Sequence, residues 1–114
     1  MSEDAIDPQK ALRSIAQMAP QYAQARANVV YLEEYRKTIK AQCMQAAEDG
    51  GHRSSAAQER EAYASPQYIA HLEAIKQAHE AAETLRWRLV AAQAAVEVWR
   101  SQEASGRAMD RGTR

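Results

Sequence analysis

The chain has 114 residues, which limits it to one domain at most. Its 15 basic and 15 acidic residues balance, which argues against the net positive field of a stand-alone duplex-DNA binder. The single cysteine, Cys43, excludes an internal disulfide and fits a reducing compartment. Because the sequence has no signal-like apolar start and no run of 18 apolar residues, we expect a cytoplasmic protein without a membrane segment.

Alanine dominates the apolar residues and phenylalanine is absent, while Gln, Glu and Arg fill most of the rest. This mixture of strong helix formers is typical of long helices or coiled coil rather than of a sheet. Alanine brings little apolar area, so the chain can bury only a thin core. Small chains with thin cores usually gain stability by association, and we therefore expect a homo-oligomer.

The first helix is expected over residues 8–49. Asp7-Pro8 places an N-cap residue before a proline at the first helical position, and Gly50-Gly51 is a stop signal. Pro20 marks either a kink or a second start. The sequence therefore leaves open whether residues 1–17 join the main helix.

The connector is a polar turn followed by a short helix, expected over residues 55–64 with Ser55 opening a capping box. Ser65-Pro66 repeats the cap-and-proline signal and starts the longest helix, expected over residues 66–104. The sequence after it is small, polar and dotted with arginine. We expect residues 106–114 to form a flexible basic tail.

Both long helices carry an apolar stripe that recurs at steps of three and four residues, which indicates a coiled-coil seam. Arg36 fills the one slot of the first stripe where an apolar residue is missing. The first stripe comprises Ile15, Met18, Tyr22, Ala25, Val29, Leu32, Ile39, Cys43 and Ala46. The second comprises Tyr68, His71, Ile75, Ala78, Ala82, Leu85, Leu89, Ala92, Val96 and Trp99.

These stripes predict an all-α fold, a long antiparallel helical hairpin of the coiled-coil type with a short connecting helix. The hairpin is expected to form one domain over residues 1–105. Its remaining apolar faces should pack against further copies of the chain, but an alanine-rich seam permits several subunit numbers.

Arg86, Trp87 and Arg88 form the clearest candidate for a functional site. Trp87 lies about 200° around the helix from Leu85 and is therefore off the seam. A base could stack on this ring while the arginines hold phosphates, as in proteins that bind single-stranded nucleic acid. Burial of Trp87 in a subunit interface, where Trp and Arg are also enriched, is the alternative.

Two further clusters combine cations with tyrosines. Arg36, Lys37 and Lys40 follow Tyr31 and Tyr35, which are one helical turn apart. The connector adds a second cluster, consisting of Arg53, Arg60 and Tyr63. Both clusters suit contacts with single strands, but acidic neighbours leave open a solvated charged face and local ion pairs instead.

No catalytic residues, cofactor site or metal site are expected, and the chain is predicted not to be an enzyme. His71 and His79 are eight residues apart, which is too far for one ion, and His79 with Glu83 supplies only two ligands. Cys43 lies on the seam without a paired histidine and is expected to be a packed thiol.

The order of these segments resembles the UvsY-type recombination mediators of bacteriophages. The resemblance is carried by the segment 35–40 (YRKTIK), then Arg60-Glu61-Ala62-Tyr63, then Arg86-Trp87-Arg88-Leu89 on a long helix with an arginine-bearing tail. It implies a ring-forming helical oligomer in the host cytoplasm. Such proteins bind single-stranded DNA and help a RecA-like recombinase replace the single-strand-binding protein.

Arg60 and Tyr63 match the basic-then-tyrosine segment associated with DNA contact in that family, whereas Gln58 and Glu59 stand where the family is richer in lysine. The sequence thus favours a single-stranded DNA-binding recombination mediator. The alternative is a phage-type helical protein-interaction module without nucleic-acid binding, either an inhibitor of a host nuclease or defence complex or an assembly scaffold.

Overall fold

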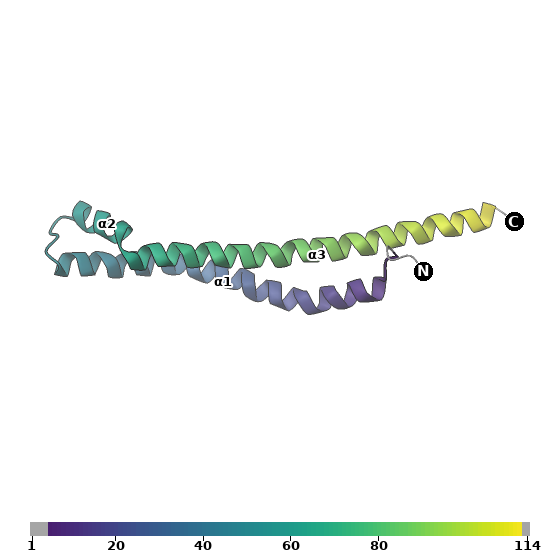
Figure 1. Cartoon of the computed structure of the whole chain (residues 1–114), viewed down its shortest axis with the longest axis horizontal. Helices are drawn as coiled ribbons and strands as arrows, with labels where there is room; N and C mark the ends of the chain where they lie inside the picture. Colours follow the sequence, from purple (N-terminus) through teal and green to yellow (C-terminus); the bar gives the residue numbers. More distant parts are fainter. Residues whose placement is uncertain (1–4, 113–114) are drawn as a thin grey trace. The chain divides into compact units, whose positions relative to one another are not determined.

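A computed structural model describes residues 5–112, which form helices and short connections without a strand. Helix α1 spans Pro8–Asp49, α2 spans Ser55–Ala64 and α3 spans Pro66–Gly112 (Figure 1). The predicted all-α class is confirmed. Within this range, none of the helices combines the length and the hydropathy that crossing a bilayer requires.

The start of α1 is capped by Asp7, whose Oδ1 accepts hydrogen bonds from the backbone N–H groups of Gln9 and Lys10 at 3.0 and 3.2 Å. Pro20 lies inside α1 and does not restart it. A proline removes only one backbone donor, and the helix continues on both sides of it. Residues 8–17 therefore belong to the main helix.

The end of α1 is a Schellman motif centred on Gly51, whose φ is 104°. The N–H of Gly51 donates to the carbonyl of Glu48, and the N–H of His52 donates to that of Ala47, both at 3.0 Å. The two bonds satisfy carbonyls that the last turn would otherwise leave unpaired. The Gly50-Gly51 stop predicted from the sequence is confirmed.

The starts of α2 and α3 are both capped by serines. Ser54, not Ser55, is the N-cap of α2, because its backbone is extended and its Oγ accepts from the N–H of Ala57 at 3.1 Å. The prediction of Ser55 was wrong by one residue. Ser65 caps α3 as expected, with its Oγ 3.3 Å from the N–H of Tyr68.

Helix α3 continues to Gly112, beyond the end expected at residue 104. The prediction of a flexible tail over residues 106–114 was therefore wrong for residues 106–112, and residues 113–114 lie outside the described range. Arg, Ala and Met in these turns are good helix formers, and Gly106 alone does not break a helix that is already formed.

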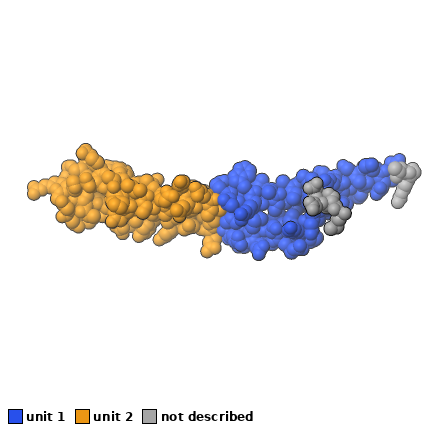
Figure 2. Space-filling view, in the orientation of Figure 1, with its two compact units in different colours: residues 1–23, 83–114 blue, residues 24–82 orange. Residues whose placement is uncertain are grey.

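The chain divides into two compact units (Figure 2). Unit 1 contains residues 1–23 and 83–114, and unit 2 contains residues 24–82. Both long helices contribute to both units, since each boundary falls inside a helix. The single domain over residues 1–105 stays a prediction.

Unit 2 holds the core. Here α1 and α3 run antiparallel, because Leu32 of α1 contacts His71 of α3, whereas Cys43, later in α1, contacts Ser65, just before α3. The buried side chains are mostly small, and Val29 is the one large side chain that is fully buried among the described residues. The others are Cys43, Ala47, Ala62, Tyr68, His71, Ala78 and Ala82.

The residues expected in the α3 seam are all buried or half-buried, as are Val29, Leu32, Ile39 and Cys43 of α1. Two details of the α1 stripe differ: Ala47 is buried instead of Ala46, and Tyr35 is half-buried beside an exposed Arg36. A straight helix returns to the same face after about 18 residues, or five turns. Val29 and Ala47 have this separation, so the buried face follows the period of a straight helix.

Unit 1 has a thinner interior. Its inward residues are half-buried at best, and none of those described is fully buried. They are Ile15, Met18 and Tyr22 from α1 and Leu85, Leu89, Ala92, Val96 and Trp99 from α3. The favourable free energy of apolar burial is therefore concentrated in unit 2.

Replacing Gly51 by alanine tests the Schellman motif. A Cβ at this position would meet no atom within 4 Å, so only the left-handed backbone opposes it. We expect Gly51→Ala to lower the free energy of unfolding by about 1–2 kcal/mol, measured by chemical denaturation. Gly50→Ala is the matched control, because its Cβ would lie 3.4 Å from the nearest atom, the Ala46 carbonyl oxygen. Equal losses in the two variants would contradict the assignment.

Candidate nucleic-acid interface

The nine residues predicted to contact nucleic acid fall into both units. Unit 1 carries Arg86, Trp87 and Arg88. Unit 2 carries Arg36, Lys37, Lys40, Arg53, Arg60 and Tyr63. Each group is therefore a separate candidate surface.

In unit 2, Lys40 joins α1 to α2. Its Nζ lies 3.0 Å from Oε1 of Glu59 and 4.9 Å from the centre of the Tyr63 ring. Tyr63 in turn meets Tyr68, at the start of α3, edge to face with ring centres 5.2 Å apart. One cation thus ties together the helix that precedes the connector and the short helix within it.

This contact stabilises the charged form of both partners. Tyr63 first, and then Glu59, raise the pKa of Lys40 to about 12, and Lys40 lowers the pKa of Glu59. The Lys40 ammonium is therefore already neutralised by Glu59 before any phosphate approaches. A strand would have to displace Glu59 to use this charge.

The three arginines of unit 2 that were predicted to contact nucleic acid differ from Lys40. Arg36, Arg53 and Arg60 are exposed and form no ion pair with another residue of the range 5–112. Arg60 precedes Tyr63 by three residues on α2, and Arg36 is one turn before Lys40 on α1. Lys37, by contrast, forms an ion pair, since its Nζ lies 3.0 Å from Oε2 of Glu34.

Tyrosines of this unit pack partly on one another. Tyr31 and Tyr35 stack with ring centres 5.7 Å apart and planes 20° apart, and Tyr35 also meets His71 at 6.0 Å. Tyr31 covers one face of the Tyr35 ring and is itself 62% exposed. Tyr63 remains 46% exposed and is the aromatic side chain nearest to the free Arg60 along α2.

In unit 1, Arg86 lies over Trp87. The guanidinium carbon is 4.8 Å from the centre of the indole ring, and Nη1 is 3.3 Å from Oε2 of Glu83. One face of the ring is therefore occupied, although Trp87 is 58% exposed. Arg88 is exposed and has no ion pair with any described residue. This site offers less open stacking surface than the sequence alone indicates.

The histidines serve as contacts between helices. Nε2 of His71 donates to the carbonyl of Leu32 at 2.7 Å, and His79 lies 2.7 Å from Glu33. These bonds could not be predicted from local sequence patterns, because they join residues 39 and 46 positions apart. In the described part of the chain, no three His, Cys, Asp or Glu side chains gather closely enough to hold a metal ion.

Cys43 is a buried thiol that shares a hydrogen bond with Ser65, at 3.0 Å between Sγ and Oγ. Ser65 Oγ also lies 2.8 Å from the Ala62 carbonyl, so its single proton serves one acceptor at a time. A cavity of about 290 Å³ opens beside the thiol, lined by Ile39, Gln42, Cys43, Ala46, Ser65 and Gln67. No charged group lines it, and the thiol acts as part of the helix junction.

The Lys40–Glu59 pair predicts a pH dependence. Because Lys40 lowers the pKa of Glu59, the contribution of the pair to stability is complete above about pH 4.5 and is lost as pH falls through the lowered value. We expect Glu59→Gln to have a lower Tm than the parent chain at about pH 7. The two Tm values should converge once the pH falls below the lowered pKa of Glu59, because the side chain at position 59 is then neutral in both chains. Thermal unfolding followed by circular dichroism measures this difference.

The matched control is Glu34→Gln, which removes the pair between Lys37 and Glu34, whose side chains are 78% and 71% exposed. Pairs that exposed contribute little, so its Tm should follow that of the parent chain at every pH. A Tm difference for Glu59→Gln that stays constant across the pH range would refute the assignment.

Comparison with known proteins finds no match to a family model, to a curated protein or to a solved structure. The resemblance to UvsY-type mediators stays a prediction from the order of the segments.

Proposed function

We propose that this protein is a self-associating, single-stranded DNA-binding recombination mediator with no chemistry of its own. The observation that carries the proposal is that three exposed arginines of unit 2, Arg36, Arg53 and Arg60, form no ion pair with a described residue, while the half-exposed Tyr63 lies on the same helix as Arg60. Arginines of this kind can bind phosphates without first breaking an internal pair.

The proposed surface consists of Arg36, Arg53, Arg60 and Tyr63. Lys40 contributes by holding α2 against α1, which places Arg60 and Tyr63 on a fixed helix rather than on a mobile loop. Tyr63 would stack on a base without reading its identity, and the arginines would hold the backbone. Binding by these means is independent of sequence, as a mediator requires.

A neutral chain can bind a strand tightly only through several weak surfaces. In an oligomer each copy presents the same small patch, and linked contacts raise the overall affinity by avidity. Phosphate neutralisation makes such binding strongly dependent on salt. By the resemblance, the partners are single-stranded DNA, a RecA-like recombinase and the single-strand-binding protein that it replaces.

A second candidate function is a helical protein-interaction module, either a phage-type inhibitor of a host complex or an assembly scaffold. It is favoured by the exposed apolar side chains of α3, among them Trp87, Val90 and Val98. Side chains of this kind mark protein contacts when they form a continuous patch. In this reading the chain binds no nucleic acid.

The double variant Arg53→Ala/Arg60→Ala tests the proposal. Loss of two phosphate contacts should weaken binding to a fluorescent oligonucleotide roughly tenfold and reduce the slope of log K against log salt by about 1.4. Anisotropy titrations at several salt concentrations measure both quantities.

The matched control is Arg13→Ala/Arg107→Ala, which removes the same charge from two exposed arginines of unit 1 and should keep most of the affinity. Equal losses in both double variants would replace the proposed surface by a diffuse electrostatic effect. A parent chain that binds no oligonucleotide at low salt would remove the proposal and leave the interaction module.

A further inference from the structure

Helix α3 has a second apolar face within unit 1. Trp87, Val90, Ala94 and Val98 follow one another at steps of three and four residues and lie within about 60° of one direction around the helix. Leu85, Leu89 and Val96, which are half-buried, lie roughly opposite. Trp87 is 58% exposed, Val90 40% and Val98 48%. This outer face has no partner among the described residues.

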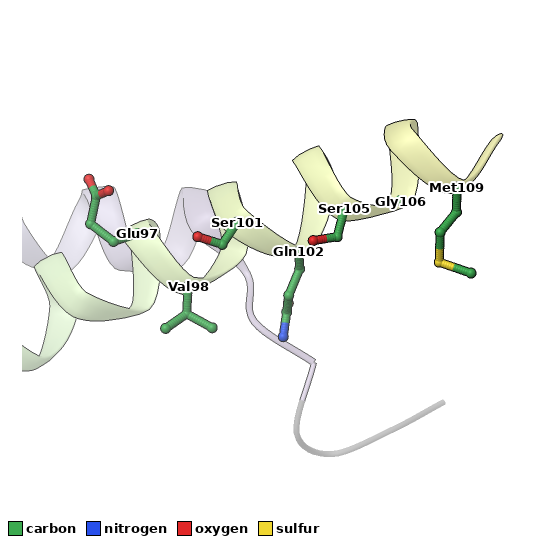
Figure 3. A pocket seen from close by; sticks show the side chains of 7 residues that line it. All are labelled: Glu97, Val98, Ser101, Gln102, Ser105, Gly106 and Met109. Atoms are coloured by element: carbon green, nitrogen blue, oxygen red, sulfur yellow. The ribbon is translucent and has the colours of Figure 1, made fainter. Parts of the chain in front are cut away.

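From Trp87 onward the outer face is uncharged, and it continues toward the end of α3. Ser101 and Ser105 extend it with small side chains, and Met109 ends it at 72% exposure. A hollow of about 560 Å³ lies along this part of the helix, between Glu97 and Met109. Figure 3 shows Val98, Gln102 and Met109 pointing to the same side of α3.

Two pairs of opposite charges accompany the face: Glu83 lies at its start, in line with Ser101, and Arg86, Glu97 and Arg100 lie along one flank. Arg86 lies 3.3 Å from Glu83, and Arg100 lies 3.4 Å from Glu97. The four side chains are between 46% and 68% exposed. Along the helix, the order of charge is therefore negative, positive, negative, positive.

Read from the opposite end, the order of charges is positive, negative, positive, negative. Two antiparallel copies can therefore place opposite charges against each other. In two antiparallel helices related by a two-fold axis between residues 91 and 92, Glu83 faces Arg100 of the other copy and Arg86 faces its Glu97. Symmetry doubles both contacts. At nearly the same register, Trp87 comes opposite Val98 at the edge of the hollow, and Val90 comes opposite the small Ala94. Charge and side-chain size thus agree on one register.

A parallel arrangement does not match in this way. It brings the charged flank of one helix against the opposite flank of the other, as e and g positions meet in parallel coiled coils. The flank opposite the charged one carries a single charged residue between residues 84 and 102, which is Arg88. Only Glu83 would then gain a partner.

We propose that two copies of the chain pair through the outer face of α3, antiparallel and centred between residues 91 and 92. This inference specifies the self-association on which the proposed function rests, and it assigns Trp87 to the contact between copies rather than to DNA. The paired segment, residues 83–101, is about 28 Å long. One helix face of this length is smaller than a standard interface of about 800 Å² per partner, so pairing should be weak and dependent on concentration.

Two charge variants test the register. Glu83→Arg/Glu97→Arg makes the flank wholly positive, and Arg86→Glu/Arg100→Glu makes it wholly negative. Each alone should stay monomeric at concentrations where the parent chain pairs, because like charges then face each other. An equimolar mixture should pair again. Sedimentation velocity measures the fraction of dimer, and circular dichroism confirms that each variant is helical.

A third variant guards against loss of folding. Exchanging all four charges, as Glu83→Arg/Arg86→Glu/Glu97→Arg/Arg100→Glu, keeps an opposite charge three residues away within each helix and also restores complementarity between copies. It should pair like the parent chain. A parent chain that stays monomeric, or charge variants that pair as well alone as when mixed, would overturn the inference.

The DNA surface proposed in unit 2 is untouched by these substitutions. A parent chain that stays monomeric but loses oligonucleotide affinity on Arg53→Ala/Arg60→Ala therefore refutes the pairing alone, whereas a parent chain that pairs but binds no oligonucleotide refutes the proposed function alone.

Discussion

The shortage of large apolar side chains is the constraint on which the rest of the structure depends. Val29 is the one large side chain fully buried among residues 5–112, and most of its buried neighbours are alanine or other small groups. Small side chains let α1 and α3 approach closely, but each contributes little apolar area. Polar contacts, from His71 to Leu32 and from Lys40 to Glu59, also join the helices of unit 2.

The same constraint explains what lies outside the core. Apolar side chains that one neighbouring helix cannot cover remain on the surface, and in unit 1 they gather on the outer face of α3. The charges are arranged differently in the two units. In unit 2 several arginines form no ion pair within the described range, which suits phosphate binding, whereas in unit 1 charges of opposite sign alternate along α3, which suits a second copy. The proposed division of labour, with DNA on unit 2 and pairing on unit 1, follows from this difference.

The accuracy of the predicted boundaries depended on how local their signals are. The caps at Asp7 and Ser65 and the stop at Gly51 were correct, because a cap bonds to backbone within a few residues. Ser54 was missed because Ser55 offers the same side chain, and only the backbone conformation distinguishes them. The end of α3 was missed because helix propensity in its last turns outweighed their polar composition.

By itself, the sequence determined the helical class, the extents of α1 and α2, the start of α3 and the residues of its inner seam, since periodicity and capping are properties of neighbouring residues. The candidate cations and aromatic residues could likewise be named from it. Only the tertiary structure decided which of these cations form an ion pair with another described residue and which do not. Glu59 reaches Lys40 across 19 positions and Glu33 reaches His79 across 46, and no pattern along the chain specifies which distant groups meet when helices pack.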